Sequence, residues 1–172
     1  MKPMHKGVIV ALVHIAIVCS LGGKLLYDRS TRPRVWVRTM AYDPDLPIRG
    51  RYASMRLLVN APPETRKPLG DPRNPWFEDV TARLAVENGQ LVAIPDENGS
   101  VRYSFRTNRQ NQADAVLSEP VAFFIPEHAM DPTWRMRGEE LWAEVTVPRK
   151  GAPRPIRLAV KKGESFTPLD LR

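Results

Sequence analysis

Residues that could perform chemistry are few and widely spaced in this chain. Four of them could bind a transition metal by type: His5, His14, Cys19 and His128. Their separations do not match the short ligand spacings of zinc sites, so neither a metal nor another cofactor is expected. Glu127 and His128 place an acid beside a base, with Asp131 close behind. Because adjacent residues of an extended chain point to opposite sides, we interpret these three as a solvated turn.

A serine nucleophile is the enzymatic alternative. An apolar N-terminal segment followed by Arg49-Gly50 and Ser54-Met55 resembles the type I signal peptidases, which are anchored β-proteins that use a Ser nucleophile and a Lys base. Ser54 with Lys67 would be the catalytic pair of such an anchored serine hydrolase. A nucleophile needs its base within hydrogen-bond reach. Because Ser54 lies inside a predicted strand and Lys67 in a Pro-rich loop, we expect no catalytic residues.

The N-terminus carries a long apolar segment. Residues 7–23, GVIVALVHIAIVCSLGG, are 17 residues without a charge. At about 1.5 Å per helical residue they reach most of the way across a hydrocarbon core of about 30 Å. Ser20 to Gly23 offers a poor signal-peptide cleavage site, and Val18 before Cys19 disfavours a lipoprotein site. We therefore expect an uncleaved anchor helix over about residues 7–27, with a cleaved signal peptide as the alternative.

Four residues mark the predicted membrane segment: Val8, Leu12, His14 and Val18. Ionisable residues inside a membrane are often functional, so His14 could be a proton or ligand site. It could equally be a neutral histidine that faces a partner helix or is simply tolerated. The segment holds no acidic partner for His14, and we favour the neutral histidine.

Positive charge gathers at the two ends of the chain. The formal net charge is +7, but residues 32–148 hold 15 Lys and Arg against 16 Asp and Glu. This balance excludes a phosphate-tracking surface, so nucleic acid is not an expected partner. More Lys and Arg follow the apolar segment than precede it. Taken alone, the positive-inside bias would keep the domain in the cytoplasm, and a cytoplasm-facing basic adaptor is therefore a second alternative.

The rest of the chain alternates apolar and polar residues in short runs, which is typical of β-strands. The expected strands are Arg34–Met40, Arg51–Val59, Arg83–Val86, Gln90–Ile94, Val101–Thr107, Val121–Ile125, Leu141–Val147 and Ile156–Lys162. Asn88-Gly89 predicts a type I′ hairpin turn, and we expect the three strands around residues 83–107 to form a meander. Residues 108–118 are expected to be a loop or one helical turn. Glu144 is expected to lie across from Arg157 or Lys161 in a closing hairpin.

The Gly50 strand also carries a family resemblance. It resembles the segment that names the GDYXXLXY family of bacterial membrane-anchored proteins, with Gly50, Tyr52 and Met55 matching, while Arg51 and Leu57 depart from the pattern. A second stretch, residues 124–127, is similar to the family's aromatic, apolar, Pro-Glu step. The residues that we assign to the family motif, as structural or partner contacts, are Gly50, Tyr52, Met55, Leu57, Phe124, Pro126 and Glu127.

The resemblance implies a location rather than an activity. It suggests a single-pass protein of the bacterial inner membrane, with its folded domain facing the periplasm or outside. We predict two parts: residues 1–31, which hold a cytoplasmic tip, the anchor and a linker, and residues 32–172, a single small antiparallel β-barrel or sandwich. The hypothesis is a non-enzymatic binding or scaffolding partner of another envelope or membrane protein. Its contacts would be the anchor helix and a sheet edge near Trp36 and Tyr52, and the sequence identifies no small-molecule ligand.

Overall fold

The computed structural model of this protein describes residues 3–42, 52–67, 77–107, 113–126, 129, 131–133 and 138–170. The chain divides into two compact units, Met1–Arg32 and Pro33–Arg172. The first unit contains the helix α1, Pro3–Thr31, and the second, which we call the β-domain, contains all the strands. Arg32 and Pro33 alone separate the end of α1 from the start of the first strand.

Helix α1 is apolar around its whole circumference. Within it, Gly7–Asp28 forms a 22-residue stretch with a mean hydropathy of 2.2, and none of its residues is buried. A helix that is apolar on every side needs an apolar environment. At about 1.5 Å per residue the stretch is about 33 Å long, which matches a bilayer core. It is therefore long and apolar enough to cross a membrane.

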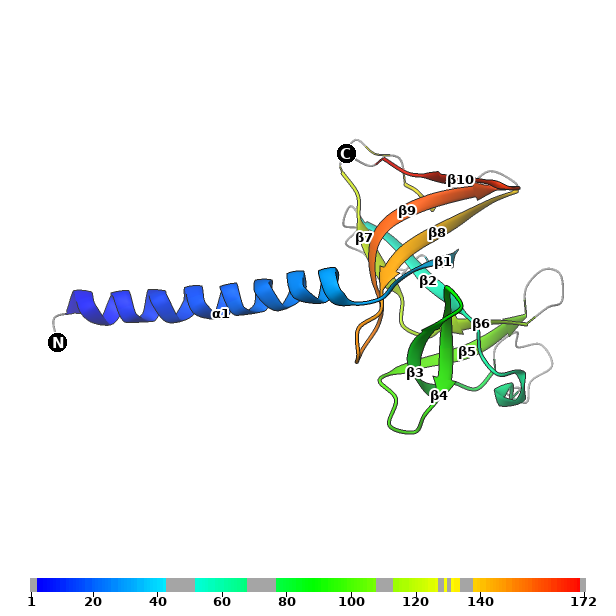
Figure 1. The fold of residues 1–172 in the computed structure, drawn as a ribbon, viewed down its shortest axis with the longest axis horizontal. Coiled ribbons are helices and arrows are strands. Elements are labelled where there is room, and N and C mark those ends of the chain that lie inside the picture. Colours follow the sequence, from blue (N-terminus) through cyan, green and yellow to red (C-terminus); the bar gives the residue numbers. More distant parts are fainter. Residues whose placement is uncertain are drawn as a thin grey trace. The chain divides into compact units, whose positions relative to one another are not determined.

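The β-domain is one continuous antiparallel sheet (Figure 1). Its strands run in the order β10-β9-β8-β1-β2-β6-β5-β3-β4, and β7 pairs with β2 beside this path. The elements are β1 Arg34–Ala41, β2 Tyr52–Val59, the 3₁₀ helix η1 Pro63–Thr65, β3 Val80–Glu87, β4 Gln90–Pro95, β5 Val101–Thr107, β6 Ala113–Leu117, β7 Val121–Phe124, β8 Glu139–Thr146, β9 Arg154–Lys162 and β10 Ser165–Pro168. The prediction of a mainly β protein behind one N-terminal apolar helix is confirmed.

The sheet curls back on itself into a half-barrel. The residue that closes the curl is Asn60, directly after β2, which forms a parallel bridge with Val92 of β4. Asn60 donates its backbone N–H to the Leu91 carbonyl at 2.9 Å and accepts from the Ala93 N–H at 2.8 Å. Because β4 ends the long strand path, this bridge satisfies backbone groups that would otherwise be open at a sheet edge.

Alternation along the strands separates two faces. On β1, Val35 and Val37 are buried in the core, while Trp36, Arg38 and Met40 lie half-buried on the opposite face. The core side holds the largest fully buried side chains of the described chain, and these include Tyr103, Met55, Leu57, Leu117 and Leu158. The face opposite the core is the one that carries charged and aromatic side chains, and it holds the candidate site.

Several expected elements are confirmed. Asn88 and Gly89 adopt positive φ angles of 50° and 73° at the β3–β4 turn, as a type I′ turn requires. The closing hairpin is β8–β9, in which Glu144 lies opposite Arg157 as expected. These features are local in sequence, so pattern alone was enough to find them.

Two expectations are wrong. Residues 113–117 form β6 rather than a loop or a helical turn. The three strands expected to form a meander do not follow each other in the sheet either, because β5 pairs with β3 and β6 and not with β4. The chain passes from β4 over β3 to β5 through a turn at Gly99. The β3–β4 hairpin therefore lies at the end of the strand path, with β4 as the last strand.

Candidate functional site

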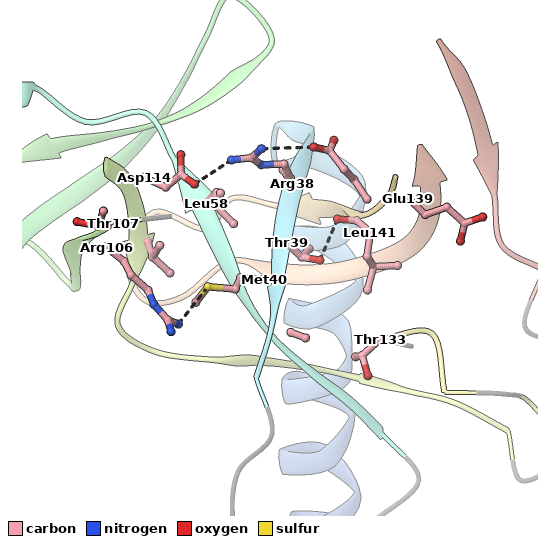
Figure 2. Close-up of a pocket in the computed structure, with 13 residues that line it drawn as sticks. Arg38, Thr39, Met40, Leu58, Arg106, Thr107, Asp114, Thr133, Glu139 and Leu141 are labelled. Atoms are coloured by element: carbon pink, nitrogen blue, oxygen red, sulfur yellow. Dashed lines mark hydrogen bonds and ion pairs between the residues drawn. The ribbon is translucent and has the colours of Figure 1, made fainter. Parts of the chain in front are cut away.

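A pocket of about 600 Å³ lies on the face opposite the core, where β8, β1, β2, β6 and β5 run beside one another (Figure 2). We call it the arginine pocket. Its lining includes Arg38, Met40, Arg106, Asp114 and Glu140. The alternation of β1 brings Arg38 and Met40 to this face, and strand register places Asp114 opposite Arg106. Five strands therefore contribute to one concave surface, which is the usual form of a ligand site.

Arg38 connects the two sides of the arginine pocket. Its Nη2 lies 3.1 Å from Oδ2 of Asp114, and its Nη1 lies 3.3 Å from Oε1 of Glu140. Figure 2 shows the guanidinium of Arg38 beside the carboxylate of Asp114. Glu140 accepts a further hydrogen bond from Nε1 of Trp142 at 3.1 Å. The arginine is thus fixed in position by partners from β6 and β8.

A second cavity, of about 570 Å³, shares Arg38, Asp114 and Glu140 with the arginine pocket. We call it the tryptophan groove, because Trp36 and Trp142 line it together with the β3–β4 turn and Asn60. The amide of Asn60 donates from Nδ2 to Oε1 of Gln90 at 2.6 Å. The groove therefore combines indole rings, amides and an ion-paired cluster in one concavity.

The two tryptophans belong to an aromatic cluster. The ring of Phe166 on β10 lies edge-on to Trp36, with centroids 4.9 Å apart, and edge-on to Trp142 at 6.2 Å. Such edge-to-face pairs are stabilising beyond the apolar area they bury. Arg157 lies over Trp36, with its guanidinium carbon 5.9 Å from the ring centroid. This cluster fixes the tryptophan side of the groove.

Arg157 also pairs with the buried carboxylate of Glu144, at 2.6 Å from Nε to Oε2. The hydrogen bond and the negative charge of Glu144 raise the pKa of Arg157. Since Glu144 is only 7 % exposed, a cation beside it is needed to offset the loss of water around the carboxylate. Arg157 of β9 and Glu144 of β8 thus form a second ion-paired group beside Trp36.

The proposed catalytic pair does not form. Ser54 is nearly buried in β2, where it lies opposite Ala122 of β7. Lys67 is exposed after η1, and within the described part of the chain no hydrogen bond joins the two side chains. The same described residues contain no group of three or more His, Cys, Asp and Glu side chains that could hold a metal ion.

The structure brings together two residues from distant parts of the family motif. Tyr52 of β2 and Phe124 of β7 lie directly opposite each other in the sheet register. Phe124 is 83 % exposed, more than any other large apolar side chain of the described chain, and Tyr52 is half-buried. Met55 and Leu57 of the same motif are instead completely buried in the core.

The structure says less about the other motif residues, which are Gly50, Pro126 and Glu127. Pro126 is half-buried just after β7. Gly50 and Glu127 lie outside the described residues, as do His5's side chain and His128. A structural role for Met55 and Leu57 follows from their burial, whereas the side chain of Phe124 is exposed.

The contact expected at a sheet edge near Trp36 and Tyr52 stays a prediction, and the edge strand beside Tyr52 is β7. Trp36 lies on β1 between β8 and β2, and Tyr52 lies on β2, which pairs with β1 and β7, so neither residue is on an edge strand. The side chain of Trp36 lies on the face opposite Val35 and Val37. The sequence shows strand alternation but not which strands end the sheet.

The four marked residues of the membrane segment all lie exposed on α1. Val8, Leu12 and Val18 are 53 %, 60 % and 68 % exposed. His14 lies among them, and its Nδ1 is 2.8 Å from the carbonyl of Val10, one turn earlier. A carbonyl can only accept, so Nδ1 carries the proton. This intrahelical bond satisfies the Nδ1 donor of His14.

Sequence reasoning missed Arg38, Asp114, Glu140 and Trp142 as members of one site. Asp114 lay in a segment expected to be a loop, and Glu140 preceded the strand expected at Leu141–Val147. Arg38 and Trp142 lay within expected strands but carried no sign of a shared site. The available signal was a set of charged residues on the polar faces of strands, which is also the pattern of a solvated surface. Only the strand order brings these residues together.

Comparisons with known proteins do not assign this site. The chain matches no protein-family model, no curated protein and no solved structure. The resemblance to the GDYXXLXY family therefore stays a prediction that rests on the residues quoted for it.

Proposed function

We propose that this protein is a single-pass, membrane-anchored protein of the bacterial envelope whose β-domain binds another membrane protein without catalysing a reaction. In this proposal α1 crosses the inner membrane and the β-domain faces the periplasm. The observation that carries the proposal is the exposed Phe124, paired with the half-buried Tyr52, on a domain joined directly to an apolar helix. The resemblance to the GDYXXLXY family supports the same location.

The anchor supports a partner in the same membrane. Only Arg32 and Pro33 separate α1 from β1, so a membrane-embedded helix would hold the β-domain within a short length of chain from the bilayer. Confinement to a surface raises the effective concentration of a domain toward other proteins of that surface. Weak contacts of the β-domain would then be sufficient for a stable association.

Phe124 supports binding through a protein contact. A phenylalanine that is 83 % exposed on a strand leaves most of its apolar surface in water, although burial of such a ring would be favourable. Aromatic side chains that become buried on association commonly contribute much of the binding free energy. Tyr52, opposite Phe124 on β2, enlarges the aromatic surface.

The test is loss of a partner in the membrane without loss of folding. We expect Phe124→Ser to remove a membrane protein that cross-links to the wild-type chain in native membranes, while Phe124→Tyr retains it. The melting temperature of the purified variants checks that folding is intact, as expected for an exposed site. A cross-linked partner retained by Phe124→Ser would contradict this binding surface.

A further inference from the structure

The geometry points to a second binding site: the tryptophan groove takes a neutral oligosaccharide. This inference is independent of the protein contact proposed at Phe124, because neither Phe124 nor Tyr52 lines the groove, whose residues come from β1, β2, β4, β6, β8 and the β3–β4 turn. It rests on three features of the groove, which are its ion-paired cluster of Arg38, Asp114 and Glu140, its exposed amides and its indole rings.

The charges of the groove favour a neutral ligand. Arg38 lies within 3.3 Å of carboxylate oxygens from both Asp114 and Glu140. Beside them, Arg157 and Glu144 form a further pair at 2.6 Å. An ionic ligand would have to compete with these existing partners for the same charges. A ligand with hydroxyl groups can instead add hydrogen bonds to the ion-paired groups without separating them.

Two exposed amides supply donors and acceptors of the kind that hydroxyl groups need. Asn60 and Gln90 share one hydrogen bond, from Nδ2 to Oε1 at 2.6 Å. Besides the atoms of that bond, Asn60 has its side-chain oxygen as an acceptor and one more N–H as a donor, and Gln90 has the two N–H groups of its amide as donors. A sugar hydroxyl both donates and accepts, so neighbouring hydroxyls of one ring can bond to such a mixed pair.

The indole rings suit the remaining surface of a sugar. One face of a pyranose ring presents C–H groups, and aromatic rings pack against apolar faces of this kind. Trp36 and Trp142 both line the groove and are held in position by Phe166. The volume of about 570 Å³ lies within the range of about 300–1,000 Å³ that is typical of small-ligand sites.

The test is a titration of the full-length protein with neutral trisaccharides. The probes are maltotriose and chitotriose, and the protein is held in a detergent without a sugar head group, because alkyl glycosides would compete for the groove. Calorimetry should show saturable binding of at least one probe. The affinity should be nearly unchanged when the salt concentration is raised, because no ligand charge is involved.

Variants link the binding to the groove. The double variant Asn60→Ala/Gln90→Ala should weaken binding about tenfold or more, which corresponds to two lost hydrogen bonds. The backbone bridge at residue 60 uses no side-chain atoms, so the double variant is expected to fold. The control is Asn98→Ala, which removes an exposed amide that does not line the groove and should leave the affinity unchanged.

Three results would overturn the inference. The first is a lack of saturable binding by both trisaccharides. The second is equal binding by wild type and the double variant, which would place the sugar elsewhere on the molecule. The third is binding in the groove only by charged peptides, with an affinity that falls as salt is added, which would identify a peptide site.

Discussion

At the scale of single residues, Tyr103 shows how the β-domain handles a buried polar group. Its hydroxyl lies 2.7 Å from Oγ1 of Thr65, which itself donates to the Pro62 carbonyl at 2.7 Å. Since the single proton of the threonine is used there, the tyrosine must donate. Burial is the main cause that raises the pKa of Tyr103 above its ordinary value of 10.0. The Tyr103 hydroxyl therefore loses its proton less readily in the folded protein than in the unfolded chain.

This difference predicts a loss of stability at high pH. A group whose pKa is raised by folding stabilises the folded protein below its unfolded pKa, and this stabilisation is lost as the pH rises through the folded pKa. Tyr103→Phe should cost about 0.5–1.5 kcal/mol at neutral pH, through loss of the hydrogen bond to Thr65. When the pH is raised from neutral to above about 10, the free energy of unfolding should fall less for the variant than for the wild-type protein.

The measurement is the free energy of unfolding of both proteins, from denaturant titrations at neutral pH and at about pH 11. The wild-type protein serves as the reference for all other groups that titrate in this range. An equal loss of stability in the two proteins would show that Tyr103 ionises as easily in the folded state as in the unfolded chain.

At the scale of elements, the turn between β4 and β5 depends on one close approach. A Cβ atom added to Gly99 would lie 2.2 Å from the Ala82 oxygen and 2.3 Å from the Ala82 carbonyl carbon. Ala82 is completely buried in β3 and is paired on both sides, with Pro95 and Val101. The backbone of β3 therefore has little freedom to move away from an added methyl group.

We expect Gly99→Ala to destabilise the protein by about 1–3 kcal/mol, the usual cost of forcing extra atoms into a packed site. Thermal unfolding followed by circular dichroism would measure the change. Glu97→Ala, an exposed substitution in the same turn, is the matched control and should change stability by no more than about 0.5 kcal/mol. A Gly99→Ala protein as stable as this control would mean that the turn can shift away from β3.

The elements also show how far the sequence could be interpreted. Asn88-Gly89 and the β8–β9 hairpin were predictable because their determinants are neighbours in the chain. The five-residue β6 was not, since ADAVL is short and carries no strong β-pattern. The place of β5 beside β3 was not predictable either, because the preference of a strand for one of two neighbours depends on packing across the whole sheet.

At the scale of the whole molecule, the candidate site is a product of strand order. Arg38 is separated from Asp114 by 76 positions and from Glu140 by 102, and they meet because β6, β2, β1 and β8 are placed in that order. A single sequence contains no signal for such pairs. Helix α1, in contrast, could be predicted from the sequence, because its length and apolar composition are local properties of one segment.

The central claim is that α1 anchors the protein in a membrane. Extraction of isolated membranes with alkaline carbonate tests it most directly, with the full chain compared with a Leu12→Arg/Val18→Arg variant. Arginine near the middle of a membrane helix costs about 2.5–3.5 kcal/mol per residue for insertion. We expect the wild-type chain to stay in the membrane pellet and the variant to be released. Release of the wild-type chain into the soluble fraction would contradict the central claim.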